Sequence, residues 1–406
     1  MSRLLRTPAF TLLLTALWST TALAAAGPSA PPTAANEFHF IVLGDSQFDD
    51  PATFNRTIDQ VRMLQPAFVV QVGDLINGYE DDLSLIEREW ARFRDQIGPL
   101  GAIPFFAVPG NHDVFNGQRA VDPRLERLFE AQWGALYYSF NYRNAAFVVL
   151  NSDSSTVENG IDPEQLDWLA NVLEGTQAEH RFVFLHRPPR FLEGADTLHE
   201  LFVRHDVDYV IYGHHHHYHH ELRDGVHYVM TNNSGTNAVP YPELGGFEHL
   251  LQVAVRDDEV SVASIEVDAV RPLDFVGPED NYGFFALARR LTGDEVVATA
   301  AGENRYSVEL SLNNPLRQSV DVYLSCGSSD GRWSFAPRAI PVIRIDADST
   351  DTVSLEAAFE PGRVPESIPS CDLEVPYQSR AGTWIRFEQT VTVNIPGFTD
   401  ESDVAR

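Results

Sequence analysis

Several short apolar segments of this chain end in polar residues that could bind a metal ion. These residues are Asp45, Gln47, Asp74, Asn111, His186, His214 and His216. Together they offer carboxylate, amide and imidazole groups, a mixture that suits Zn, Mn or Fe, whereas calcium would require oxygen ligands throughout. One tetrahedral site cannot use so many ligands, but two divalent metal ions that share a bridging carboxylate would use them all. The residue types therefore predict a two-metal site.

The apolar segments in front of these residues have the composition of buried strands. They span residues 38–43, 67–72, 103–108, 181–185 and 207–212. Continuous runs rich in Val, Ile and Phe are typical of strands that are buried on both faces. Ligands at the carboxyl ends of such strands have the placement expected in an α/β sheet.

Helical segments lie between these strands. Residues 55–64 and 83–97 are predicted to be helical, and a third helix is expected to begin at Asp162-Pro163 and to end at Gly175. The alternation of strands and helices predicts one large α/β domain over residues 37–267.

The sequence pattern changes after residue 267. Residues 268–282 are rich in proline and charge and are predicted to be a linker. Over residues 283–397 apolar and polar residues alternate between turn-forming pairs, which predicts an immunoglobulin-like all-β sandwich. Residues 398–406 are expected to be an acidic tail. Because the sandwich shows no comparable cluster of titratable groups, it is expected to be an accessory module, dispensable for the hydrolysis of a small substrate.

The two cysteines of the chain, Cys326 and Cys371, both belong to the predicted sandwich. In an oxidising compartment one disulfide is the expected state. Two buried free thiols are the alternative.

The first residues resemble an export signal. Arg3 and Arg6 precede an apolar run over residues 9–18, and small residues follow up to Ala26, the order typical of a secretory signal peptide over residues 1–26. Residues 27–36 are expected to be a flexible lead-in. No later segment is apolar for about 18 residues, so no transmembrane segment is expected in the mature chain, which is predicted to be periplasmic or extracellular.

Composition excludes two broad classes of protein. The 44% of hydrophobic residues among 406 can form at least one large core, which excludes wholesale disorder. The net charge of −29, from 58 acidic and 29 basic residues, repels polyanions, so a protein that wraps nucleic acid is not expected.

Five motifs of the chain resemble those of the calcineurin-like metallophosphoesterases, in the same order. They are Asp45-Ser46-Gln47, Gly73-Asp74, Gly110-Asn111-His112-Asp113, His186 and Gly213-His214-His215-His216. The resemblance covers residues 37–267 and implies a four-layer α/β sandwich with two facing sheets. It also implies a hydrolase that acts on phosphoric ester bonds of small substrates through two metal ions and an activated bridging water.

The resemblance also implies a role for each motif residue. Asp45, Gln47 and His216 would hold the first metal ion, Asn111, His186 and His214 would hold the second, and Asp74 would bridge them. His112 would be the histidine that binds no metal and acts beside the phosphoryl group, with Asp113 supporting it. Because the family has histidine where this chain has Gln47, the identity of the metal ions stays open among Mn, Zn and Fe.

Two arginines after His186 could bind a substrate phosphate. Arg187 and Arg190 flank prolines there, although arginines near a surface loop are common. Asn151 and Asp153 follow another strand and either line the cleft or shape a turn. Phosphomonoesters and phosphodiesters both remain open as substrates. The alternative function is a catalytically inactive surface or binding protein whose β-domain carries the function.

Overall fold

The computed structural model describes residues 36–46, 51–154, 156–157, 159–231, 241–266, 270–293, 296–337 and 342–398. The expected signal peptide, nearly all of the lead-in, Gln47 and residues 399–406 of the expected tail lie outside these ranges. Among the helices within them, none is both long and apolar enough to cross a membrane.

The first six-stranded sheet has the strand order β12-β11-β10-β1-β2-β3. Three of the predicted strands, β1, β2 and β3, lie side by side in it and are parallel. Its strands are β1 (Phe38–Leu43), β2 (Val69–Gln71), β3 (Phe105–Ala107), β10 (His249–Arg256), β11 (Glu259–Glu266) and β12 (Val270–Arg271). The outer face of this sheet packs against α1 (Pro51–Leu64), α2 (Leu83–Ile97) and α4 (Pro123–Trp133). Apolar side chains of these helices and of the sheet form one hydrophobic core between them.

The second six-stranded sheet has the order β4-β5-β6-β7-β9-β8 and carries the two remaining predicted strands. Its strands are β4 (Tyr138–Tyr142), β5 (Ala145–Val149), β6 (His180–Phe184), β7 (Tyr209–Tyr212), β8 (His219–Arg223) and β9 (Val226–Met230). The outer face packs against α5 (Pro163–Gly175) and α6 (Ala195–Arg204). Asp162 caps α5 by accepting a hydrogen bond from the backbone N–H of Gln165, as its sequence signal predicts.

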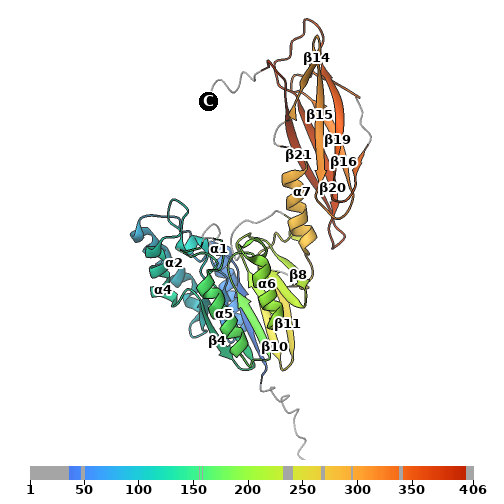
Figure 1. Cartoon of the computed structure of the whole chain (residues 1–406). Helices are drawn as coiled ribbons and strands as arrows, with labels where there is room; N and C mark the ends of the chain where they lie inside the picture. Colours follow the sequence, from blue (N-terminus) through green and yellow to red (C-terminus); the bar gives the residue numbers. More distant parts are fainter. Residues whose placement is uncertain are drawn as a thin grey trace, which may run out of the picture. The chain divides into compact units, whose positions relative to one another are not determined.

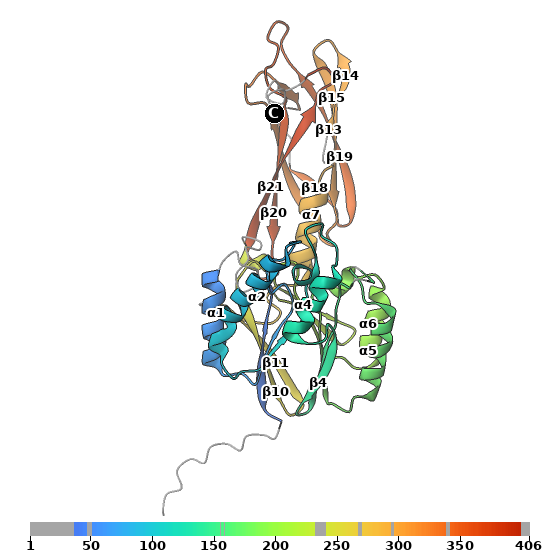
Figure 2. The same ribbon diagram turned by 90° about the vertical axis from the view of Figure 1, so that its left-hand side faces the viewer.

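The inner faces of the two sheets pack against each other through aromatic side chains. The Phe40 ring of the first sheet lies 5.3 Å from that of Phe147 and 5.2 Å from that of Phe182 in the second, both edge to face. Helices therefore cover both outer faces of two facing sheets, with α1 on one side of the strands and α5 and α6 on the other in Figure 2. The prediction of a four-layer α/β sandwich is confirmed.

The C-terminal part of the chain is an all-β sandwich, as predicted (Figure 1). Its sheets have the orders β13-β21-β20-β16-β18 and β14-β15-β19-β17 and share one apolar core. The strands are β13 (Val296–Val297), β14 (Thr299–Gly302), β15 (Arg305–Asn314), β16 (Val320–Gly327), β17 (Ser334–Ala336), β18 (Ile343–Ile345), β19 (Ser349–Ala358), β20 (Ser370–Gln378) and β21 (Trp384–Asn394). Cys326 and Cys371 face each other across β16 and β20 and form a disulfide.

The segment expected to be a linker contains regular structure. β12 extends the first sheet to Arg271, beyond the expected domain boundary at residue 267. A π-helical turn, η4 (Glu279–Gly283), leads into the helix α7 (Phe284–Arg290), which stands where the sandwich was expected to begin. Phe284 and Leu287 of α7 are buried in the core of the sandwich, so this helix is anchored there.

Candidate metal centre

Strand ends of both sheets bring the motif residues together. Asp45 follows β1, Asp74 follows β2, and Asn111 opens the short helix α3 (Asn111–Val114) after β3, all in the first sheet. From the second sheet, His186 follows β6, and His214 and His216 follow β7. Parallel strands that end at one edge explain why residues up to 171 positions apart in the chain share one site.

One group of side chains surrounds the ring of His186. Its Nε2 atom lies 3.2 Å from Oδ2 of Asp74, 3.0 Å from Oδ1 of Asn111 and 3.1 Å from Nδ1 of His214. The ligand atoms of Asp74, His186 and His214 all lie within 4.8 Å of one another. Four donor atoms thus converge on one buried point.

The protein fixes which nitrogen of His186 faces this point. Nδ1–H of His186 donates a hydrogen bond to the carbonyl oxygen of Val72 at 2.8 Å. Nε2 is therefore the atom free to bind a metal ion, an arrangement common among histidine ligands. The side-chain N–H of Asn111 donates to the hydroxyl of Tyr79 at 2.5 Å, which turns the amide oxygen toward His186.

A second group shares Asp74 with the first. The ligand atoms of Asp45, Asp74 and His216 also lie within 4.8 Å of one another. Nε2 of His216 lies 3.0 Å from Oδ2 of Asp45, whose carboxylate accepts the backbone N–H of His214 at 3.2 Å. Because Asp74 belongs to both groups, it stands where a bridging ligand between two metal ions would stand.

The backbone is strained at three of the candidate ligand positions. Asp74, His214 and His216 adopt φ values of 52°, 76° and 56°, in the left-handed region that residues with a side chain rarely adopt. The motif glycines allow close approach: a Cβ atom at Gly213 would lie 2.3 Å from Oδ1 of Asp45, and one at Gly73 would lie 2.4 Å from Nδ1 of His186. These loops therefore adopt backbone conformations of higher energy, and these conformations bring the candidate ligands together.

The electrostatics of the site suit cations. Burial lowers the pKa of His186, but the Asp74 carboxylate and its hydrogen bond more than compensate and raise this pKa to about 9. Burial, aided by the charge of His186, lowers the pKa of His214, so its ring is neutral. Buried carboxylates beside a neutral imidazole and an amide oxygen form a donor set that divalent transition metals satisfy, so the residues present fit a two-metal centre.

His112 lies beside these groups without belonging to them. Its Nδ1–H donates to the carbonyl oxygen of Asn77, and its Nε2 lies 4.0 Å from Oδ2 of Asp74. The ring packs against Tyr79 with centroids 4.3 Å apart. The imidazole is thus held in one orientation, with Nε2 directed toward the centre.

Among the described residues, the hydrogen bonds of Asp113, which was expected from the sequence to support His112, go to backbone groups and not to the His112 ring. Its carboxylate accepts hydrogen bonds from the backbone N–H groups of Leu75 (2.9 Å), Ile76 (3.3 Å) and Gly110 (2.8 Å). Asp113 therefore joins the loop after β2 to the loop after β3.

The two candidate phosphate-binding arginines differ in position. Arg187 lies at the centre: its Nη1 is 3.1 Å from Nε2 of His214, and its Nε donates to the buried carboxylate of Asp153. Arg190 donates both of its short hydrogen bonds to Glu221, which neutralises its charge. Of these two arginines, only Arg187 has a hydrogen-bond contact with a candidate metal ligand, His214, within the described part of the chain.

Sequence reasoning missed the residues that hold the ligands in place. Tyr79 orients Asn111 and packs on His112, and the carbonyl groups of Val72 and Asn77 orient the two rings. No motif marks these residues. Their roles depend on loop geometry, which a single sequence does not reveal.

Known proteins with similar sequences are phosphoesterases or phosphatases. The sequence profile of the calcineurin-like phosphoesterase family matches residues 38–218. The serine/threonine-protein phosphatase CPPED1 of Mus musculus is 33% identical over 143 residues, which are 32% of this chain and 43% of that protein. The protein of that name from Homo sapiens is 31% identical over 140 residues, with the same shares. The chain thus spans less than half the length of these relatives.

Two solved structures show a more distant likeness. A dimetal phosphatase from Danio rerio has 14% sequence identity and a TM-score of 0.47, over 59% of this chain and 99% of that chain. A purple acid phosphatase from Lupinus luteus seeds has 16% identity and a TM-score of 0.48, over 60% of this chain and 54% of that chain.

Proposed function

Because residues 38–218 belong to the calcineurin-like phosphoesterase family, we propose that this chain is a metal-dependent hydrolase of phosphoric esters. The observation that carries the proposal is the position of Asp74, whose carboxylate is shared by two groups of buried ligand atoms. A shared carboxylate is the feature by which two-metal hydrolases hold their ions close together.

The two ligand groups suggest which residues would hold each ion. Asp45 and His216, with Gln47 from the family resemblance, would hold the first ion. Asn111, His186 and His214 would hold the second, and Asp74 would lie between the two ions. Bound divalent ions would polarise the phosphoryl oxygens and lower the pKa of a water molecule between them. The donor set suits Mn, Zn or Fe.

His112 is proposed to act on the leaving oxygen of the ester. Its Nδ1 is engaged by the carbonyl of Asn77, so only Nε2 can exchange a proton with the substrate. Because Nε2 points toward Asp74 at 4.0 Å, a phosphoryl group at the centre would lie within its reach. A histidine held in this way can donate a proton to a departing alkoxide.

Arg187 is proposed to bind a phosphoryl oxygen. Its ion pair with the buried Asp153 fixes the guanidinium beside His214, and a preorganised guanidinium binds phosphate with little loss of side-chain freedom. The local positive charge of Arg187 and the metal ions also explains how an acidic protein could bind an anionic substrate.

We also propose that the protein is exported to the periplasm or the extracellular space. The composition of residues 1–26 supports this location, and the disulfide between Cys326 and Cys371 suits an oxidising compartment.

A metal-replacement assay tests the activity. The purified protein is stripped with a chelator, reloaded with Mn, Zn or Fe, and assayed on nitrophenyl phosphate and on bis(nitrophenyl) phosphate. We expect hydrolysis of at least one ester only after reloading. A protein that binds two ions per chain and hydrolyses neither ester would contradict the proposal and favour the alternative of an inactive binding protein.

A further inference from the structure

A large pocket opens beside the metal centre. Its volume is 850 Å³, and it is lined by Asn159, Arg187, Pro188, Arg190, Phe191, His214, His215, His216, His217, Tyr282, Phe285, Ala286, Arg289 and Arg290. Two metal-centre histidines and Arg187 belong to this lining. The last five residues belong to η4 and α7, which lie outside the segment that matches the family. The pocket therefore combines the metal centre with a wall specific to this chain.

One face of the helix α7 lines the pocket, and another face packs in the sandwich core. Phe284, Leu287 and Leu291 are buried in the sandwich core, at the three- and four-residue spacing of one helical face. Tyr282, Phe285 and Arg289 lie on the side that lines the pocket. Anchoring by the sandwich thus gives the wall a fixed position, and a chain ending near Asp280 would lack that wall.

Contacts with the loop after β7 attach this segment to the metal centre. Asn281 donates a hydrogen bond to Nδ1 of His217 at 2.8 Å, and the Phe285 ring stacks on His217 with centroids 5.0 Å apart. Since His217 directly follows the candidate ligand His216, the wall and the ligand loop form one continuous packed unit.

The charge of the pocket is the reverse of that of the whole chain. Four arginines line it, and no aspartate or glutamate does, although acidic residues outnumber basic ones by 58 to 29 in the sequence. Arg187 is paired with Asp153, and Arg190 with Glu221. Arg289 and Arg290 are exposed and make no ion pair with any residue that the structure describes.

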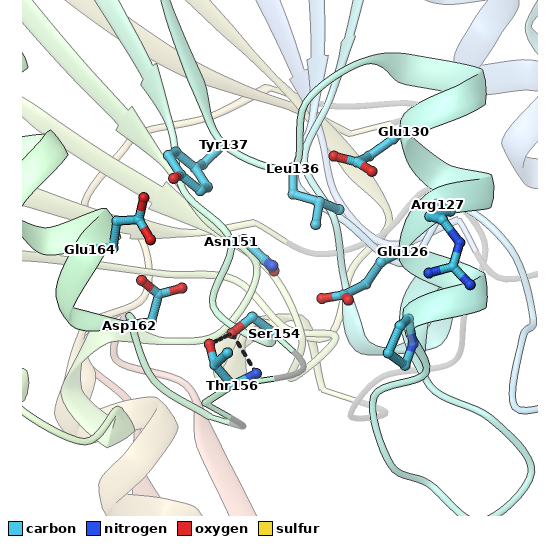
Figure 3. A pocket seen from close by; sticks show the side chains of 11 residues that line it. Glu126, Arg127, Glu130, Leu136, Tyr137, Asn151, Ser154, Thr156, Asp162 and Glu164 are labelled. Carbon is cyan, nitrogen blue, oxygen red and sulfur yellow. Dashed lines mark hydrogen bonds between the residues drawn. The ribbon is translucent and has the colours of Figure 1, made fainter.

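A second pocket, drawn in Figure 3, has the opposite character. Its volume is 340 Å³, and carboxylates of Glu126, Glu130, Asp162 and Glu164 enter its lining together with one arginine, Arg127. Such a lining repels phosphate and carboxylate groups. Of these two pockets, the arginine-lined one is the better suited to an anionic ligand.

Aromatic side chains line the same pocket as the metal-centre histidines and the two arginines of α7. The side chain of Phe191 is 48% exposed, and its ring meets that of Tyr282 edge to face at 5.3 Å. An exposed aromatic ring that packs on a partly buried one inside a pocket favours an apolar or aromatic ligand group.

We propose that Arg289 and Arg290 bind a second anionic group of the substrate, an inference that rests on the proposed function. The preferred substrates are then small phosphoric esters in which an apolar or aromatic body carries a second phosphate or carboxylate group. The scissile phosphate lies at the metal centre with Arg187, the body lies against Phe191 and Tyr282, and the second anion reaches the end of α7. Guanidinium groups bind both kinds of anion by paired hydrogen bonds.

The test compares substrates that differ in the second anion. Phenyl phosphate, 4-carboxyphenyl phosphate and 1,4-phenylene bisphosphate are assayed with the metal-loaded full chain and with its Arg289→Gln/Arg290→Gln variant. We expect the preference in kcat/KM for the doubly substituted esters over phenyl phosphate to fall about tenfold in the variant, mainly through KM. Hydrolysis of phenyl phosphate should change by less than about twofold. Because each preference is a ratio within one protein, differences in leaving group cancel between the wild type and the variant.

Two further variants sharpen the result. Arg204→Gln removes an exposed arginine from the last turn of α6, away from the pocket lining, and should leave every preference unchanged. Arg289→Lys/Arg290→Lys keeps the charge and should retain most of the preference. The relative losses for the carboxylate and the phosphate ester identify which second anion the arginines favour.

Two outcomes distinguish an error in the role of Arg289 and Arg290 from an error in the proposed hydrolase activity. If phenyl phosphate is hydrolysed but the wild type shows no preference, or the glutamine variant keeps it, the role of Arg289 and Arg290 is wrong while the hydrolase stands. If the metal-loaded wild type hydrolyses none of the three esters, the proposed function itself is wrong, and this inference falls with it.

Discussion

Nε2 of His186 lies 3.1 Å from Nδ1 of His214, and both atoms face the carboxylate of Asp74. Two ring nitrogens at this distance cannot both present lone pairs without a cation or a proton between them. Because Nδ1–H of His186 donates to the carbonyl oxygen of Val72, the proton or metal ion between the two rings must be bound at Nε2 of His186 or Nδ1 of His214. In the metal-free protein a proton occupies this position.

Metal binding at this position should therefore release a proton. The pKa of His186 is lowered by burial but raised overall to about 9 by Asp74, so at pH 7 the metal-free ring is protonated. A metal ion must displace this proton, and its affinity should rise by up to tenfold per pH unit between pH 7 and pH 9 and then level off. Calorimetry in buffers of different ionisation enthalpy measures the released proton. A pH-independent affinity over this range would contradict a metal ligand at His186 that is protonated in the metal-free protein.

Replacement of His112 should separate catalysis from metal binding. His112→Ala should keep both metal ions, because His112 belongs to neither group of ligand atoms. Turnover of an alkyl phosphate should fall by about 10²- to 10⁴-fold, and that of nitrophenyl phosphate by less, because a good leaving group needs little protonation. Metal analysis and rates on both esters test this prediction. An equal loss on both esters, or the loss of an ion, would show that His112 is not the acid.

Gly213 should be intolerant of a side chain. Alanine there would place its Cβ atom 2.3 Å from Oδ1 of Asp45, which should displace Asp45 and weaken metal binding at the Asp45–His216 group by about tenfold or more. Gly175→Ala is the matched control, because its Cβ atom would have no neighbour within 4 Å. Metal titration of both variants tests the prediction, and unchanged affinity in Gly213→Ala would exclude Asp45 as a ligand.

Buried neutral histidines should make the metal-free protein less stable in acid. Burial lowers the pKa of His249 to about 4, although its hydrogen bond to the Phe247 carbonyl opposes this. The unfolded chain, with a histidine pKa of about 6.5, binds more protons below that pH, so the free energy of unfolding falls as the pH drops from about 6.5 to 4. His249 alone should account for about 1 to 2 kcal/mol of the loss between pH 7 and pH 5.

Urea unfolding with a chelator present measures this loss. His249→Asn should be destabilised at pH 7 by the loss of its hydrogen bonds, yet should lose less stability than the wild type on acidification. If both proteins lose the same free energy between pH 7 and pH 5, His249 is not neutral in the folded protein.

The two facing sheets and the positions of the candidate ligands at their edges could be predicted because buried strands appear in the sequence as continuous apolar runs. The predicted run 38–43 coincides with β1, and the candidate ligand Asp45 follows it after one residue, Gly44. By contrast, α7 could not be predicted: it follows a segment rich in proline, and its start has no side-chain cap. Its two faces are defined only by the sandwich core and the pocket, which are formed by residues distant in the sequence.

The ion pairs between residues distant in the chain could not be predicted from the sequence either. Arg187 and Arg190 looked alike in the chain, yet Arg187 pairs with Asp153 beside the metal centre, whereas Arg190 pairs with Glu221 of β8. Asp113 likewise binds backbone groups 37 and 38 residues away. These partners are set by the positions of loops in the folded chain, which local sequence patterns do not encode.

The number of metal ions bound by Asp74→Asn, together with its rate of ester hydrolysis, tests the central claim most directly. Asparagine keeps an oxygen that can accept the backbone N–H of His112, as Oδ1 of Asp74 does at 2.9 Å, but it removes the bridging charge. We expect two ions per chain in the wild type and in the control Asp167→Asn, an exposed position on α5. In Asp74→Asn we expect at most one ion and a rate at least about a hundredfold lower, with the fold retained. An Asp74→Asn protein that binds two ions and hydrolyses esters at the wild-type rate would contradict the account.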